Sequence, residues 1–117
     1  MSVSNTVSNV KLNELIEVMT RFREIKQSMN VNEMLVFLQI AALDSPSVKE
    51  VSVRTGIPRM SVSRHAMNLS VRGTKYTQTS GVGLIERNTD QENELITRLT
   101  ITEKGKELLE KIAPRIP

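Results

Sequence analysis

One segment of the chain, VKEVSVRTGIPRMSVSRHAMNL, constrains the fold more than any other. Ser47, with Glu50 three residues later, matches a capping box, in which each side chain can bond a free backbone N–H at a helix start. Gly56 tolerates the left-handed backbone that ends a helix in a sharp turn, and Pro58 has the fixed φ of a first helical turn. The pattern therefore predicts a helix-turn-helix over residues 47–70.

The second helix of this motif has two different sides. Val62, Ala66 and Leu69 recur at positions i, i+4 and i+7, so we expect them to face the core. The remaining positions are mostly short polar or cationic side chains, which can reach base edges and phosphates from a helix lying in a major groove. The predicted contact residues on this helix are Arg59, Ser61, Ser63, Arg64 and Asn68.

The positive charge of the chain is concentrated in the same region. Residues 45–88 hold seven Lys/Arg and two Asp/Glu, whereas residues 1–44 hold four and five and residues 89–117 hold five and six. No acidic residue occurs between Glu50 and Glu86. A basic surface confined to one motif is what phosphate binding requires. The alternative is a solvated basic face without a partner.

Composition limits the other classes of function. A chain of 117 residues with 38% hydrophobic and 25% charged residues predicts one globular domain over residues 1–117. The first ten residues lack the features of a signal peptide, and no apolar run is long enough to span a membrane, so we expect a cytoplasmic protein without a membrane partner. With one Tyr and two Phe, single-strand recognition by base stacking is poorly supported.

The sequence contains no cysteine and a single histidine, His65. This composition excludes thiolate metal sites and cysteine nucleophiles, and one histidine cannot anchor a typical transition-metal site. No phosphate-binding glycine loop or strained nucleophile turn is present. We therefore predict no cofactor, no metal and no enzymatic activity, and we expect His65 to be partly buried and bonded to a backbone carbonyl.

The segment before the motif predicts two helices. Apolar residues follow helical spacing over residues 9–29, which predicts a long amphipathic helix whose surplus apolar surface favours dimerisation. From Met34 to Leu43 the sequence is almost continuously apolar, so we expect the central core helix there.

The segment after the motif changes to a period of two. Over residues 83–101 the alternation predicts a β-hairpin around the polar turn TDQEN, followed by a helix over residues 102–113. A hairpin after a helix-turn-helix is a wing, so the predicted class is mainly α with a small β-hairpin, a winged helix-turn-helix. We predict that Arg87 and Arg98 flank the wing tip and contact DNA, although Asp90 and Glu92 at the tip would repel DNA if they pointed at it.

The loop between the recognition helix and the wing, residues 71–83, is rich in Gly, Ser and Thr. It also carries two basic residues, Arg72 and Lys75. We predict that these two side chains contact the sugar-phosphate backbone next to the recognition helix.

The order SVSRHAMNL, GLIER, acidic turn and ITRLTITEKGKELLE resembles the MarR family of winged-helix regulators over about residues 33–112. The resemblance implies a homodimer on a pseudo-palindromic DNA operator, with terminal helices at the dimer interface and recognition helices in successive major grooves. This chain departs from the family in a longer loop at 71–83, a shorter C-terminal helical region, and His65 where an aliphatic residue is usual. Such a short, divergent member would suit a phage or a mobile element.

Three functions follow from these observations. The favoured one is a homodimeric, sequence-specific regulator of transcription that binds double-stranded DNA, most often a repressor in this family. The second is a winged-helix accessory factor of replication, excision or phage control that acts through protein contacts, with Met60 and Met67 as adaptable contact residues. The third, response to a small-molecule effector, is least favoured because short helices leave little room for a pocket.

Overall fold

The computed structural model describes residues 8–70 and 82–115. These residues form two compact units, one of residues 8–29 with 107–115 and one of residues 30–70 with 82–106. The first unit holds together because its long helix contacts the short 3-10 helix η1 (Ala113–Arg115) at the end of the chain.

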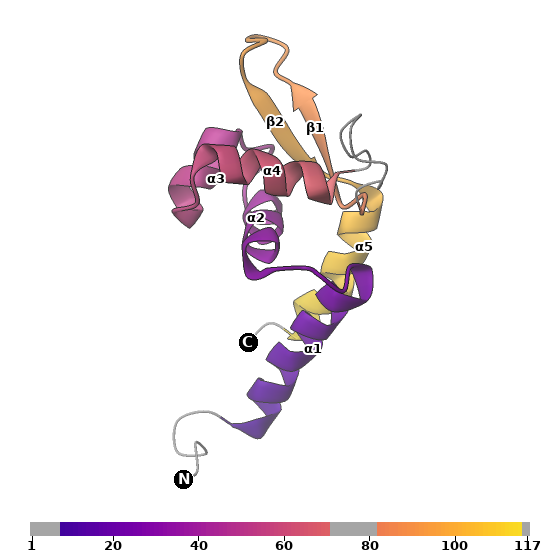
Figure 1. Ribbon diagram of the computed structural model, residues 1–117. Helices are drawn as coiled ribbons and strands as arrows, with labels where there is room; N and C mark the ends of the chain where they lie inside the picture. The colour runs from indigo at the N-terminus through magenta and orange to yellow at the C-terminus, as the bar shows by residue number, and fades with distance from the viewer. Residues whose placement is uncertain (1–7, 71–81, 116–117) are drawn as a thin grey trace. The chain divides into compact units, whose positions relative to one another are not determined.

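The first unit contains α1 (Asn9–Ile25), which begins at the N-cap Ser8 (Figure 1). The helix ends four residues before the predicted limit of 29, and Lys26 has an extended backbone. Met29 is nevertheless buried, and its N–H donates to the carbonyl of Lys26 at 2.9 Å. The last helical turn closes with the N–H of Lys26, which donates to the carbonyl of Phe22 at 3.2 Å.

The apolar stripe of α1 is only partly covered by its own chain. Val18 and Phe22 are buried. The adjoining apolar residues of the same stripe, one to two turns nearer the N-terminus, are exposed: Leu12, Leu15, Ile16 and Met19.

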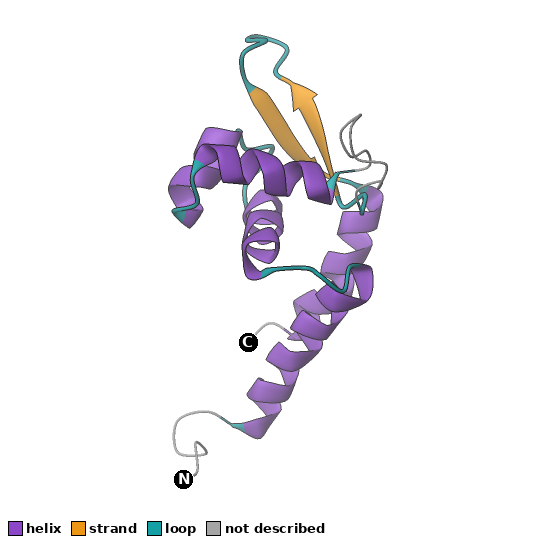
Figure 2. Cartoon of the chain, in the orientation of Figure 1, coloured by secondary structure: helices purple, strands orange, loops and turns teal. Residues whose placement is uncertain are grey.

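The second unit is built on three helices: α2 (Val31–Ala42), α3 (Val48–Thr55) and α4 (Arg59–Leu69) (Figures 1 and 2). Each helix of the three contacts the other two. Their shared core consists of Val36, Phe37, Ile40, Val51, Val62, Ala66 and Leu69. The central position predicted for α2 is thus observed, although Leu35, at 41% exposure, shows that its apolar surface is not buried on every side.

The turn between α3 and α4 has the predicted chemistry. The capping box of Ser47 and Glu50 is formed in both directions. Gly56 ends α3 with a left-handed backbone at φ 77° and ψ 3°. The hydroxyl of Ser52 donates to the carbonyl of Ile57 at 2.6 Å, which fixes the exit of the turn. Pro58 is the N-cap of α4, so this helix begins one residue later than the sequence pattern predicts.

The wing is an antiparallel hairpin of β1 (Ile85–Thr89) and β2 (Thr97–Ile101), paired from Ile85 with Ile101 to Thr89 with Thr97. The predicted alternation starts at Leu95, but that residue lies before the strand and is 94% exposed. The turn is longer than predicted because Asp90 Oδ1 accepts from the N–H groups of Glu92 and Asn93, which bends the backbone away from the ladder.

Two isolated bridges join the wing to the helices: Ser70 pairs with Ile85, and Ser47 pairs with Arg98. After the wing, α5 (Glu103–Ile112) begins where the hydroxyl of Thr102 accepts from the N–H of Gly105 at 3.1 Å. No helix in the described ranges combines the length and apolar character required to cross a membrane.

Candidate nucleic-acid interface

The helix α4 buries one side and exposes another. Val62, Ala66 and Leu69 are fully buried, as the sequence predicts. Of the predicted contact residues on this helix, Arg59, Arg64 and Asn68 are exposed, whereas Ser61 and Ser63 are half-buried. No acidic side chain lies in its first turn. The exposed side of α4 is therefore cationic and polar.

The predicted contact residues do not share a single line along α4. At about 100° per residue, Arg59 and Arg64 lie roughly 140° apart around the helix axis. Arg64 and Asn68 lie opposite the buried side, together with Met60. Arg59 and Ser63 lie on the flank toward α3, where both line a groove.

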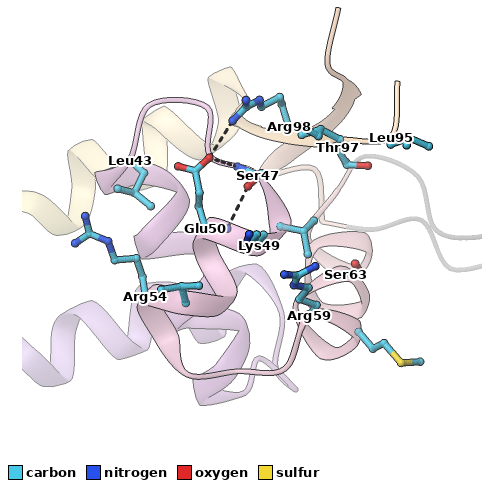
Figure 3. A pocket seen from close by; sticks show the side chains of 14 residues that line it. Leu43, Ser47, Lys49, Glu50, Arg54, Arg59, Ser63, Leu95, Thr97 and Arg98 are labelled. Carbon is cyan, nitrogen blue, oxygen red and sulfur yellow. Dashed lines mark hydrogen bonds and ion pairs between the residues drawn. The ribbon is translucent and has the colours of Figure 1, made fainter. Parts of the chain in front are cut away.

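This groove, of about 820 Å³, lies between α3, the first turn of α4 and the end of the wing turn (Figure 3). Three exposed cations line it, Lys49 and Arg54 from α3 and Arg59 from α4. Within the described ranges none of the three makes an ion pair. The apolar part of the lining includes Val53 and Leu95. The groove thus presents free positive charge beside apolar surface.

Arg98 lies at the wing end of the groove and joins the wing to α3 (Figure 3). Its Nε donates to Asp90 Oδ2 at 2.8 Å, and its Nη1 donates to Glu50 Oε1 at 3.0 Å. The N–H of the next residue, Leu99, donates to the carbonyl of Pro46 at 2.9 Å. The sequence predicts Arg98 as a DNA contact, whereas the structure engages it with two carboxylates of its own chain.

The same contacts engage the acidic residue at the wing tip. Asp90 binds Arg98, so its charge is compensated within the wing. Hydrogen bonds from Arg98 and from the N–H of Glu92 lower the pKa of Asp90. The pKa of Glu50 is lowered first by its hydrogen bonds from Ser47 and then by Arg98. The two carboxylates in turn raise the pKa of Arg98.

The other predicted basic contacts lie outside the groove. Arg87 is exposed on β1, opposite Leu99 in the hairpin, and does not line the groove. Arg72 and Lys75 belong to residues 71–81, outside the described residues. The turn itself exposes Glu92 and Glu94, which makes its tip acidic.

Sequence reasoning missed the contribution of α3. Lys49 and Arg54 line the groove with Arg59, although none of the predicted contacts belongs to α3. The signal was present, because Arg54 lies inside the acid-free interval that marks the motif. His65 is half-buried as predicted, but its Nδ1 finds no hydrogen-bond partner in the described part of the chain, so the expected bond from this atom is not formed.

The described ranges also contain no group of three His, Cys, Asp or Glu side chains arranged to hold a metal ion. What the site offers chemically is a set of hydrogen-bond donors and positive charges on exposed helix surfaces. Such a surface suits a polyanion with a regular shape.

Comparison with known proteins supports the fold assignment. No family model and no curated protein sequence matches the chain. Among solved structures, a transcriptional regulator from Thermotoga maritima is similar at TM-score 0.68 and 20% identity, over 90% of this chain and 66% of that one. A MarR transcriptional regulator from Methanosarcina mazei is similar at TM-score 0.66 and 15% identity, over 97% and 73% of the two chains.

A third similar structure is the PcaV transcriptional regulator from Streptomyces coelicolor, solved with its natural ligand. It matches at TM-score 0.61 and 15% identity, over 99% of this chain and 77% of that one. The chain thus spans about two thirds to three quarters of the length of these regulators. Its helices and hairpin follow in the same arrangement, and the fold is a winged helix-turn-helix of the MarR type.

Proposed function

We propose that the protein is a sequence-specific, double-stranded DNA-binding transcriptional regulator that acts as a homodimer. The observation that carries the proposal is the exposed surface of α4, which presents Arg64 and Asn68 outward and Arg59 on the flank toward α3, with no acidic residue on that helix. A helix of this kind fits the major groove of B-DNA. The fold supports the proposal, since the similar Thermotoga and Methanosarcina structures are transcriptional regulators.

Each exposed group has a role in this proposal. Arg64 binds the O6 and N7 of a guanine, and Asn68 binds an adenine one turn further along. Arg59 and the two cations of α3, Lys49 and Arg54, bind phosphates on one side of the major groove. Further phosphate contacts come from the half-buried hydroxyls of Ser61 and Ser63 and from the guanidinium of Arg87. Arg72 and Lys75 are proposed as contacts because of their charge alone.

Selection of bound duplexes from a random pool, followed by binding measurements across a salt series, tests this function. We expect one recurring half-site, two copies of it about one helical turn apart, and affinity that falls steeply with salt. Arg64→Gln should relax the preference for guanine at one position and leave the salt dependence nearly unchanged. Equal binding to selected and random duplexes would rule the proposal out.

The exposed apolar stripe of α1 supports the homodimer. Leu12, Leu15, Ile16 and Met19 lie beside the buried Val18 and Phe22, so the stripe is wider than its own chain covers. A second copy of α1 has the same apolar stripe, and pairing of the two helices would bury both stripes away from water. Two recognition helices would then face two half-sites.

Light scattering on the full chain tests this interface. We expect a dimer for the native chain and a monomer for Ile16→Glu, because a carboxylate in the paired stripe would be buried without a partner. Asn13→Glu places the same charge on the exposed polar side of α1 and should remain dimeric. A dimer for both variants would assign the interface elsewhere.

We further propose that the regulator is a repressor in the cytoplasm, because a dimer covering an operator within a promoter blocks polymerase access. A reporter driven by a promoter containing the selected site should fall in output when the protein is expressed. An increase in output would identify an activator. The groove is assigned to DNA in this proposal, so no small-molecule effector is included.

A second candidate function is favoured by the exposed apolar residues around the groove. Val53 and Leu95 are 74% and 94% exposed, which suits an accessory factor that binds another protein. Charge reversal at Arg59 and Arg64 distinguishes the two functions. Loss of activity supports DNA binding, whereas retained activity supports the protein partner.

A further inference from the structure

Met60 is an unusual residue for the exposed side of a recognition helix. Its side chain is 82% exposed in the first turn of α4. It lies at the edge of the groove, which it lines with Arg59 and Ser63, and next to the outward stripe of Arg64 and Asn68, whose side chains are cationic or polar. The core does not use it, because α4 already packs on α2 and α3 through its fully buried opposite side.

An exposed thioether gains free energy when an apolar group displaces the water around it. The major groove offers one such group on its base edges, the C5-methyl of thymine. N-terminal residues of a recognition helix are those that contact base edges. We therefore infer, resting on the proposed function, that Met60 is a specificity-determining residue that reads the methyl group of a thymine in each half-site.

The position of Met60 relative to Arg64 sets the spacing of the bases that they read. The two residues are one turn apart on the same side of α4, which is a rise of about 6 Å along the helix axis. Base pairs follow each other at about 3.4 Å. The thymine read by Met60 should therefore lie about two base pairs from the guanine read by Arg64.

The chemistry recognised is the methyl group on C5 of a pyrimidine, which 5-methylcytosine also carries. A selection from unmodified duplexes separates these sources, because thymine alone carries the methyl group there. Recovery of thymine at the position supports the assignment. Recovery of cytosine, with binding that tightens only after its methylation, would overturn it.

Replacement of each operator thymine by uracil removes the methyl group and leaves the base-pairing pattern intact. We expect one thymine per half-site at which the replacement weakens binding about fourfold, the loss expected for one buried methyl group. Replacement in both half-sites should weaken binding about fifteenfold. The other thymines should tolerate the replacement.

Met60→Ala is the matching change in the protein, and its exposure means that the fold does not depend on the side chain. The variant should bind the thymine and uracil operators equally at that position. Val31→Ala, an exposed apolar residue in the first turn of α2 that does not line the groove, is the control and should keep the fourfold difference.

The outcomes separate this inference from the proposed function. Binding to the selected operator with no thymine sensitive to uracil overturns the role of Met60 and leaves the regulator intact. A Met60→Ala variant that is as sensitive to the uracil replacement as the native chain would likewise overturn the role of Met60 and leave the regulator intact. A native chain that prefers no duplex over random DNA overturns the proposed function and this inference with it.

Discussion

Removal of one groove cation should change the salt dependence of DNA binding by a calculable amount. Arg59 is exposed in the groove and has no ion-pair partner in the described part of the chain, so Arg59→Gln removes a charge without freeing a carboxylate. Each phosphate contact contributes a slope of about −0.9 to log K against log salt. A two-fold dimer loses two contacts, so the slope should become shallower by about 1.8.

This change corresponds to an easily measured difference. Between 50 and 200 mM salt, a slope difference of 1.8 means that the native affinity falls about 12-fold more than that of the variant. Fluorescence anisotropy with a labelled operator duplex measures both slopes. Arg23→Gln, an exposed arginine in the last turn of α1 in the other unit, removes the same net charge and should leave the slope unchanged.

Two results would refute this reasoning. An unchanged slope in Arg59→Gln would mean that the groove does not follow a phosphate backbone. An equal loss of slope in Arg23→Gln would mean that binding responds to net charge and not to the placement of the cation.

Three further changes test the fold around the site. Gly56→Ala should lower the free energy of unfolding by about 1 kcal/mol in urea denaturation, because the left-handed backbone strains a residue that has a Cβ. Open space surrounds the added carbon, so no collision adds to this cost. Gly56→Asn should lower the free energy less, because asparagine tolerates the left-handed backbone. Gly105→Ala should lower the free energy of unfolding by about 1–3 kcal/mol in the same measurement, because the new Cβ would collide with the backbone just before β1. A free energy within about 0.5 kcal/mol of the native value would contradict this. Acid should loosen the wing: the lowered pKa values of Glu50 and Asp90 stabilise the fold at neutral pH, and this contribution is lost as the pH falls below about 4. Amide exchange of wing residues followed against pH measures this loss, and a Glu50→Gln/Asp90→Asn double variant should not show it.

The sequence was sufficient where a structure depends on near neighbours. The capping box of Ser47 with Glu50 closes within three residues and is formed. The left-handed turn at Gly56 likewise needs only its own backbone and the residues beside it. Local rules therefore located the helix-turn-helix and the wing.

Features that depend on distant residues were not predicted. Arg98 meets Glu50 across 48 residues of sequence, so the spacing within the wing gave no sign that its charge is already used. The position of the groove depends on how α3 and the wing turn pack. Helical arithmetic alone would have separated Arg59 from Arg64, since a spacing of five residues places two side chains about 140° apart around the helix axis.

The contacts of Glu50 explain how an acidic residue fits beside a surface proposed to bind DNA. Its Oε1 accepts from the N–H of Ser47 at 3.3 Å, which starts α3, and from Arg98 at 3.0 Å, which holds the wing. One carboxylate therefore fixes both the first helix of the motif and the hairpin relative to it, while Arg98 compensates its charge. Lys49, Arg54 and Arg59, which have no ion-pair partner among residues 8–70 and 82–115, then dominate the groove. Replacing Glu50 to make the surface more basic would remove this contact between α3 and the wing and leave Asp90 as the carboxylate that binds Arg98.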